Sequence, residues 1–330
     1  MQDMTSIDVV IPNYNYGRYL AGCVGSVLDQ DIDELRILII DNASSDDSAS
    51  IARALARRDS RIELRLRPSN LGAHASFNEG IDWAQADYLL ILCADDLLVP
   101  GTLKEARRIL DRAPSANLAY GRSLLLHDGE TLAYTENRRR TWDVNAGSDF
   151  LKMLCFLGKN PVSGPTVLVR TVTQKQVGHY TTRLSHTDDL EMWMRFALTG
   201  DIASTGTVQA IARVHGSSRS ARVRGTHLWN RQFEAAFRLF FYRAGASCPD
   251  AASLLRIAEH AISDRAYWSA LRALIFHEPD AGRLFFDAIR LRPTAAVFPP
   301  LGYLAQEGRL KKALSLAWCA CVASAASADG

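Results

Sequence analysis

The stretch that most constrains the fold is an apolar run, Tyr88 to Ala94, which ends on two adjacent carboxylates, Asp95 and Asp96. A run of aliphatic residues without polar alternation is typical of a strand covered on both faces, as in a parallel sheet flanked by helices. Ligands of such sheets bind beyond the carboxyl ends of the strands, where Asp95 and Asp96 would lie. Two adjacent like charges repel each other, so the pair favours a divalent cation, Mg²⁺ or Mn²⁺. A plain capping or turn role for either aspartate remains open.

The composition is that of an ordinary globular protein with room for one large domain and a smaller one, since the 330 residues are 48% hydrophobic and 22% charged. The 38 basic and 36 acidic side chains nearly balance, which argues against a nucleic-acid partner. Six scattered cysteines without a Cys-x-x-Cys pair predict reduced thiols and a cytoplasmic location. We expect no signal peptide and no spanning helix, and contact with the inner face of a membrane stays open.

Apolar strand-like segments alternate with amphipathic helical segments through the first half of the chain. Strands are expected at 7–11, 35–40, 62–66, 88–92, 118–126, 166–170 and 208–214. Helices are expected at 16–30, from the loop after residue 47 through residue 58, and at 74–84, 103–110, 150–156 and 188–197. We expect the turn-rich segment from Pro12 to Asn15 to end the first strand, because proline cannot donate to a ladder. Alternation in units of this length predicts a parallel α/β sheet with right-handed crossovers.

After residue 225 the pattern changes to helices alone. They are expected at 233–242, 251–262, 267–275, 282–291 and from 310 onward. We therefore divide the chain into an α/β domain, residues 1–225, and an all-helical C-terminal region, residues 226–330.

Taken together and in this order, several short motifs resemble the family 2 glycosyltransferases over roughly residues 7–220. The motifs are Val9 to Asn15, Asp41 to Asp46, Asn70 to Gly72 with Asn78, Ala94 to Asp96, Asp188-Asp189 with Trp193 and Arg195, and Arg213 to His215 with Ser218. The resemblance implies a GT-A fold, which is a Rossmann-like, mostly parallel sheet flanked by helices. It also implies an inverting transfer of sugar from a nucleotide-diphosphate donor to a carbohydrate or lipid-linked acceptor, as in surface polysaccharide or glycolipid assembly.

The same resemblance implies roles for individual residues. The positions that match the family's nucleotide-sugar-binding residues are Pro12, Tyr14, Asn15, Asp41, Asn42, Asn70, Asn78 and Asp95. Asp96 and His215 match positions at the metal, Mg²⁺ or Mn²⁺, and Asp189 matches the general base that takes the proton of the acceptor hydroxyl. The chain departs from the family at two positions where many members carry acids. Asn42 puts the identity of the nucleotide's base in question, and Cys93 leaves the metal to the Asp95-Asp96 pair.

Simpler roles stay open for several of these residues. Asp188 and Asp189 also fit the acidic first turn of a helix, and His215 also fits a histidine that ends a strand and bonds only to backbone. Arg219, with Arg222 and Arg224, fits either a segment that closes over phosphates or a solvated loop.

Two other functions remain as alternatives to an enzyme of this family. A non-catalytic nucleotide-sugar-binding or scaffolding module would not need a general base. A dehydrogenase or nucleotidyltransferase with a Rossmann-type sheet is disfavoured, because no glycine-rich phosphate loop follows the first strand.

Overall fold

The structure, a computed structural model, describes residues 5–130, 141–219, 221, 223, 225–244, 247–248 and 250–304. The chain divides into two compact units, Met1–Leu151 with Pro161–Arg222 and Lys152–Asn160 with Val223–Gly330. The division into domains that fold independently, with its boundary at residue 225, stays a prediction.

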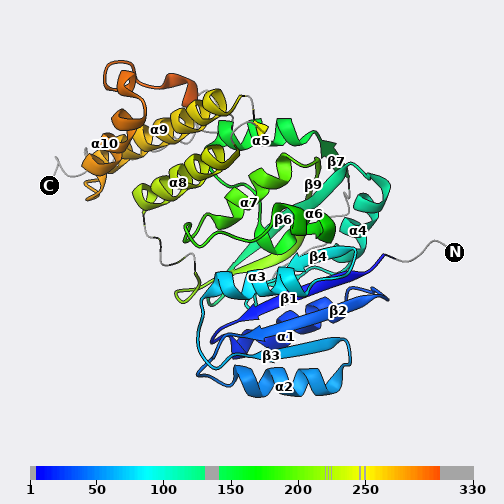
Figure 1. The fold of residues 1–330 in the computed structure, drawn as a ribbon. Coiled ribbons are helices and arrows are strands. Elements are labelled where there is room, and N and C mark those ends of the chain that lie inside the picture. Colours follow the sequence, from blue (N-terminus) through cyan, green and yellow to red (C-terminus); the bar gives the residue numbers. More distant parts are fainter. Residues whose placement is uncertain are drawn as a thin grey trace. The chain divides into compact units, whose positions relative to one another are not determined.

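The first unit is built on a mixed sheet whose described strands run in the order β3-β2-β1-β4-β8-β6-β9-β5, with β7 beside β9 (Figure 1). The strands are β1 Ile7–Asn13, β2 Leu35–Asp41, β3 Ile62–Leu66, β4 Tyr88–Ile91, β5 Leu97–Leu98, β6 Ala116–His127, β7 Trp142–Asn145, β8 Leu168–Arg170 and β9 Asp201–Val214. Parallel pairing is confirmed within β3-β2-β1-β4 and between β6 and β9. β8, β5 and β7 pair antiparallel. The sequence did not predict β5 and β7, because strands of two and four residues are too short to leave a recognisable pattern.

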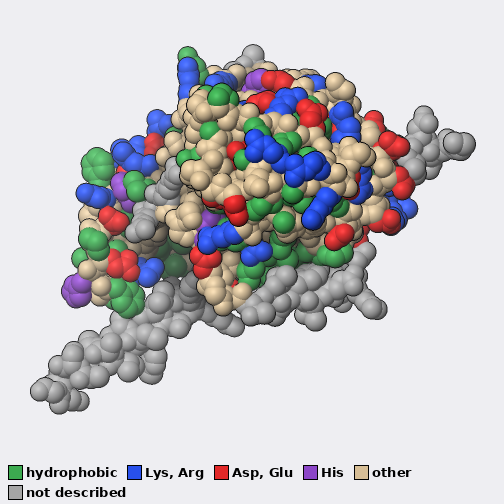
Figure 2. Space-filling model, turned by 90° about the horizontal axis from the view of Figure 1, so that it is seen from below, with side chains coloured by type: hydrophobic (Ala, Val, Ile, Leu, Met, Phe, Trp, Pro, Cys, Tyr) green, Lys and Arg blue, Asp and Glu red, His purple; other side chains and the backbone are tan. Residues whose placement is uncertain are grey.

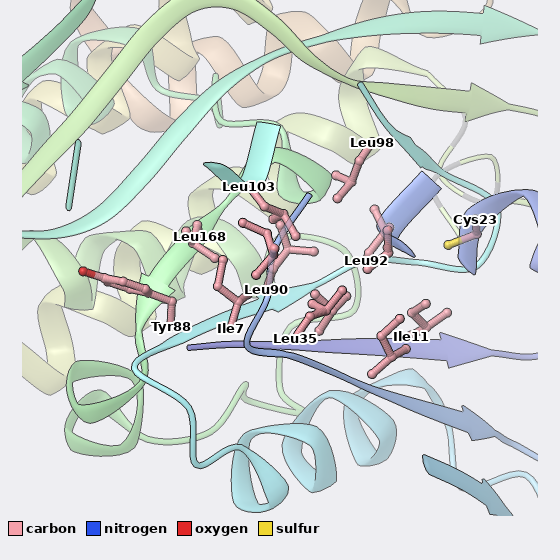
Figure 3. Packing of buried hydrophobic residues seen from close by; sticks show 14 of the residues in the cluster. Ile7, Ile11, Cys23, Leu35, Tyr88, Leu90, Leu92, Leu98, Leu103 and Leu168 are labelled. Atoms are coloured by element: carbon pink, nitrogen blue, oxygen red, sulfur yellow. The ribbon is translucent and has the colours of Figure 1, made fainter. Parts of the chain in front are cut away.

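Helices cover both faces of the parallel half of the sheet. The helices of this unit are α1 Gly17–Leu28, α2 Ser48–Arg58, α3 Ala73–Trp83, α4 Thr102–Arg112, α6 Thr171–Val177 and α7 Asp188–Ala197, and α5 Gly147–Leu157 runs on into the second unit. On one face, Val9 and Ile11 of β1 join a buried cluster with Leu20 and Val24 of α1. Figure 3 shows part of this cluster around Leu90 of β4. Val10 points to the other face, toward Gly80 of α3. Burial on both faces explains why these strands read as unbroken apolar runs.

Gly80 allows α3 to approach β1 closely, which makes it a test of this packing. A Cβ built at Gly80 would lie 2.5 Å from Cγ1 of Val10. We expect Gly80→Ala to lower the free energy of unfolding by about 1–3 kcal/mol, because the extra methyl overpacks the interface. Gly25 of α1 is the matched control, since its Cβ would meet nothing within 4 Å. Gly25→Ala should raise stability by roughly 0.5–1 kcal/mol in the same urea titration. Equal effects of the two substitutions would contradict the close packing.

The first strand is longer than predicted, because Pro12 and Asn13 continue β1 and pair with Ile40 and Asp41 of β2. The prediction that Pro12 ends the strand is wrong for a local reason. The carbonyl of Pro12 accepts the N–H of Ala94 (3.3 Å), so the ring nitrogen faces the same side, where β4 has already ended. The proline therefore removes one bond only from the continuation of this pairing beyond β4, and the pairing of β1 with β2 is kept.

The described part of the second unit is helical, with α8 Thr226–Ala244, α9 Ala251–Ile275 and α10 Ala281–Leu291. The two helices predicted at 251–262 and 267–275 are one, α9. The polar segment between them is paired by tertiary contacts instead of forming a loop: Ser263 Oγ donates to Ala288 O (2.7 Å), and Asp264 pairs with Arg292 (3.0 Å). The helix predicted from residue 310 lies outside the described residues.

Two surface properties bear on partners. Figure 2 shows basic and acidic side chains interspersed over one face of the molecule, in keeping with the near balance of charges in the sequence. Within the residues that the structure describes, no helix is both long enough and apolar enough to cross a membrane.

Candidate active site

The turn after β4 presents Asp95 and Asp96 at the carboxyl end of the parallel strands. The N–H of Leu92 donates to Val10 O (2.9 Å), and the N–H of Asp96 donates to Cys93 O (3.0 Å), which closes the turn against β1. Asp95 and Asp96 are only 7% and 9% exposed. The structure therefore places this carboxylate pair at the sheet edge where the sequence predicted it.

The end of β9 meets this pair. Nε2 of His215 lies 3.1 Å from Oδ2 of Asp95, and the backbone N–H of Arg213 donates to Oδ1 of Asp96 (3.0 Å). Burial raises the pKa of Asp96 well above its usual range, and the charge of Asp95 adds to the shift. Burial also raises the pKa of Asp95, against the opposing effect of His215. A cation beside the two carboxylates would relieve both penalties.

Asp95 and Asp96 fit a cation that takes most of its ligands from water and substrate phosphates. No three His, Cys, Asp or Glu side chains in the described ranges are arranged to enclose a metal ion. Two carboxylates that leave the remaining positions to water and substrate phosphates are the usual protein contribution to a Mg²⁺ site. His215 bonds to the Asp95 carboxylate, so the alternative that it contacts only backbone is not what the structure shows. Its role at a metal stays a prediction.

The loop after β2 is braced by its own polar side chains. Oδ1 of Asp41 accepts hydrogen bonds from Asn13 Nδ2 (2.7 Å) and Ser44 Oγ (2.6 Å). Asn42 donates to Asn70 Oδ1 (2.8 Å), which also accepts from the N–H of Gly72 (2.8 Å). Asp41, Asn42 and Asn70, which the sequence assigned to the nucleotide, therefore form one framework at the ends of β1, β2 and β3.

Sequence reasoning missed Arg67, which fixes the orientation of Asn42. Nη1 of Arg67 donates to Asn42 Oδ1 (3.1 Å), and the N–H of Leu71 donates to the same oxygen (3.0 Å). A guanidinium only donates, so this oxygen and the amide nitrogen of Asn42 cannot exchange places. Arg67 is in turn held by Glu79 of α3. An arginine directly after a strand was the available signal, but its partners lie far away in sequence.

The other predicted nucleotide residues differ in how they are placed. Tyr14 is 40% exposed beyond the end of β1. Oδ1 of Asn15 accepts the N–H of Ser45 (2.7 Å), which links the loops after β1 and β2. Asn78 is engaged elsewhere, because its amide group both donates to and accepts from the backbone of Tyr180 (3.1 and 2.8 Å). A nucleotide contact by Asn78 stays a prediction, and its visible role is to hold Tyr180.

The start of α7 carries the second acidic pair, and its two members have different surroundings. Asp188 is buried and lies 3.2 Å from Nε2 of His74 and 2.5 Å from Nη2 of Arg219. Burial would raise the pKa of Asp188, but these two partners outweigh it and hold the pKa below its usual value. Asp189 accepts the N–H of Leu190 (2.7 Å). Burial, followed by the charge of Asp188, raises the pKa of Asp189 to about 7.

A carboxyl group with a pKa of about 7 is suited to accept a proton near neutral pH. If Asp189 is the base, transfer requires its ionised form, so the rate should rise with pH through about 7 and level off above it. The measurement is the rate at saturating donor between pH 5.5 and 8.5. A rate that is flat over this range, with the chemical step rate-limiting, would contradict the assignment.

Arg219 neutralises Asp188 instead of lying free in a solvated loop. Its guanidinium also donates to the carbonyl of Ser185 and lies over the ring of Phe77, with 5.8 Å to the ring centroid. Arg222 and Arg224, grouped with it in the sequence analysis, lie outside the described residues. His74, the second partner of Asp188, carried no recognisable signal in the sequence, because it lies on a different helix.

Asp96 of the first acidic pair and both members of the second line one cavity of about 150 Å³. Its polar lining includes Asp96, Asp188, Asp189 and Arg219, and its apolar lining includes Leu89 and Ile91 of β4 and Val167 and Val169 at β8. Trp193 of α7 also lines this cavity and is 3% exposed, yet none of the described residues accepts a hydrogen bond from its Nε1. Leaving a buried donor unpaired costs about 1–3 kcal/mol. Trp193 is thus both buried and part of the site wall.

Comparison with known proteins gives a family for the first half of the chain. The model of the family described as "Glycosyl transferase family 2" matches residues 8–164. Residues 8–164 therefore form a family 2 glycosyltransferase domain. The matched residues run from β1 into the loop that precedes β8. They include Asp95 and Asp96 but not Asp189 or His215. The roles of those last two residues therefore stay predictions.

Curated relatives are similar over parts of this chain. An uncharacterised protein of Mycobacterium tuberculosis is 28% identical over 67% of this chain and 70% of its own length. A GalNAc(5)-diNAcBac-PP-undecaprenol beta-1,3-glucosyltransferase of Campylobacter jejuni is 32% identical over 30% of this chain. This chain spans only 33% of the length of that enzyme.

Solved structures confirm the predicted GT-A fold. TarS 1–349 of S. aureus in complex with UDP-GlcNAc superposes with a TM-score of 0.64 at 16% identity, over 94% of this chain and 90% of that one. Mannosyltransferase PcManGT from Pyrobaculum calidifontis, in complex with GDP-Man and Mn²⁺, gives 0.59 at 17% identity, over 96% and 87%. At these identities the likeness is one of fold.

Proposed function

We propose that this family 2 glycosyltransferase is an inverting, metal-dependent enzyme that moves a sugar from a nucleotide-diphosphate donor to an acceptor hydroxyl. The observation that carries the proposal is the shared cavity, which is lined both by Asp96, from the acidic pair suited to a cation, and by Asp189, a carboxyl with a pKa of about 7. A protein that only binds a nucleotide sugar has no use for the second group. The alternative of a non-catalytic scaffolding module is therefore disfavoured.

The donor would lie along the carboxyl ends of β1, β2 and β4. Tyr14 offers an exposed ring for stacking on the base, and the braced amide of Asn42 offers hydrogen bonding at a base edge. Pro12, Asn15, Asp41 and Asn70 shape this wall, and Asp95 lies toward the ribose and diphosphate.

Asp96, with Asp95 and His215 beside it, would hold Mg²⁺ or Mn²⁺ against the diphosphate. When bound, the ion would neutralise the negative charge that builds on the leaving nucleotide. A neighbour of the same fold was solved with Mn²⁺, which supports a divalent ion in this type of site.

Asp189 would take the proton from the acceptor hydroxyl as the oxygen attacks the anomeric carbon. The hydroxyl oxygen forms the new bond while the bond to the nucleotide diphosphate breaks, so one displacement inverts the configuration. Arg219 and His74 keep Asp188 ionised, and the charge of Asp188 in turn keeps the proton affinity of Asp189 high enough for this role. A positioned base contributes about 10²–10⁴ in rate.

The acceptor is proposed to be a carbohydrate or a lipid-linked saccharide, in surface polysaccharide or glycolipid assembly. The support is a similar Campylobacter jejuni enzyme named for an undecaprenol-linked acceptor. Such a substrate would place the protein in the cytoplasm, at the inner face of the membrane.

A thermal-shift screen of nucleoside diphosphates, each with and without Mn²⁺, tests the proposal. A ligand that binds only the native state stabilises it by about 2.7 kcal/mol at a hundredfold excess over Kd. We expect at least one diphosphate to raise the melting temperature by several degrees in Mn²⁺ and by much less without it. The nucleoside monophosphates are the matched controls. The absence of a shift with every diphosphate would contradict a nucleotide-sugar enzyme.

A further inference from the structure

We propose that the cavity behind Asp189 binds the N-acyl group of an amino sugar, with Trp193 Nε1 donating to the acyl oxygen. This inference rests on the proposed function, because it names the class of sugar that the same site takes. It is carried by the walls of the cavity and by the unpaired indole N–H, and not by any similarity to other proteins.

The size of the cavity suits a small substituent. A cavity of about 150 Å³ can hold a molecule the size of benzene. An acetamido group has four heavy atoms, so it fits with space to spare, whereas a whole pyranose ring with its hydroxyls would not fit entirely inside. The ring would therefore lie at the mouth of the cavity, beside Asp96 and Asp189.

The chemistry of the cavity walls favours an acyl group over a hydroxyl group. Aliphatic side chains of Leu89, Ile91, Val167 and Val169 form one part of the cavity wall and offer no hydrogen bonds, while Gln174, Tyr180 and His186 are polar members of the lining. A hydroxyl against the aliphatic part would lack a partner for some of its hydrogen-bonding capacity, which is costly. The methyl of an acetamido group gains from contact with the same carbons.

Trp193 favours an acyl group over a plain methyl substituent. Its Nε1 is a donor only, it is buried, and no described residue accepts from it. The methyl of a deoxy sugar would leave this donor unpaired, whereas an acyl oxygen pairs it. The remaining acyl-amide N–H can donate to one of the carboxylates in the lining, Asp96 or Asp189.

The test compares matched sugars in the parent protein and in Trp193→Phe, which keeps an aromatic ring and removes the donor. One arm measures binding of UDP-GlcNAc against UDP-Glc, and of UDP-GalNAc against UDP-Gal, in Mn²⁺ by calorimetry. The second arm measures p-nitrophenyl N-acetyl-β-glucosaminide against p-nitrophenyl β-glucoside by saturation-transfer NMR. A preference in the first arm assigns the acyl group to the donor, and one in the second arm assigns it to the acceptor.

We expect the parent to bind the N-acetylated member about tenfold tighter in one arm, and Trp193→Phe to lose most of that preference. Val167→Leu is the second variant, because it fills the apolar part of the cavity without touching the donor. It should weaken the N-acetylated sugar and leave the hydroxylated one nearly unchanged. Circular dichroism of both variants controls for folding.

Equal binding of both members in both arms would overturn the inference, as would a preference that survives Trp193→Phe in a folded protein. This failure differs from failure of the proposed function. In the latter case no nucleoside diphosphate binds in the melting screen, while the glycoside arm still reports whether the cavity prefers an N-acyl group.

Discussion

Replacing Asp189 by Asn is expected to lower the rate of sugar transfer by about 10² or more while donor affinity stays within a few-fold of the parent. The amide keeps the size of the side chain and can still accept the N–H of Leu190, which Asp189 accepts at 2.7 Å. It removes only the proton acceptor. If Asp189 merely caps α7, the variant should be nearly as active as the parent, because Asn is as good a cap as Asp.

The stability of Asp189→Asn supplies a control that does not depend on an acceptor. The pKa of Asp189 is raised in the native state to about 7, so its contribution to stability is present at acidic pH and is lost as the pH rises through 7. Asn does not titrate. The melting temperature of the variant should therefore match that of the parent below about pH 4, where the carboxyl is protonated in both the native and the unfolded state, and should exceed it increasingly as the pH rises to about 7. The opposite trend would show that the carboxylate is favourably paired and is not the proposed base.

Replacing Asp96 by Asn is expected to abolish the Mn²⁺-dependent part of nucleoside diphosphate binding. The variant keeps an acceptor for the N–H of Arg213, which bonds to Asp96 at 3.0 Å, so the turn after β4 should persist. The affinity for the diphosphate in Mn²⁺ should fall by more than 10–100-fold, which is the typical cost of removing a residue that only supports a metal ligand.

Asp143→Asn is the matched control for this substitution, because Asp143 is an exposed carboxylate of β7. Calorimetric titration of the diphosphate with and without Mn²⁺ measures both variants. Unchanged metal-dependent binding in Asp96→Asn, with normal folding, would remove Asp96 from the proposed metal site.

The parallel core of the fold was predictable because each of its strands is buried on both faces. β3 and α7 lie at the residues that the sequence predicted, Ile62–Leu66 and Asp188–Ala197. The boundary at Pro12 was missed because whether proline can end a strand depends on where the neighbouring strand stops. The break predicted inside α9 was wrong because its polar residues have tertiary partners, which a local pattern cannot reveal.

The candidate site was predictable as a set of motifs but not as a network. The carboxylates of Asp95, Asp96 and Asp189 stand out because strand ends and helix starts leave recognisable patterns. Arg67 and His74 act through contacts made across the fold, and neither lies in a motif. The unpaired donor of Trp193 could not be foreseen, since an aromatic residue on an apolar helix face reads as core.

The most direct test of the central claim is the anomeric configuration of the transferred sugar. The donor is the sugar nucleotide whose diphosphate raises the melting temperature, a panel of simple glycosides serves as acceptors, and the product is read by the coupling of its anomeric proton in NMR. A single displacement with Asp189 as base predicts inversion, so an α-linked donor should give only a β-linked product. A product that retains the configuration of the donor would contradict the proposed mechanism.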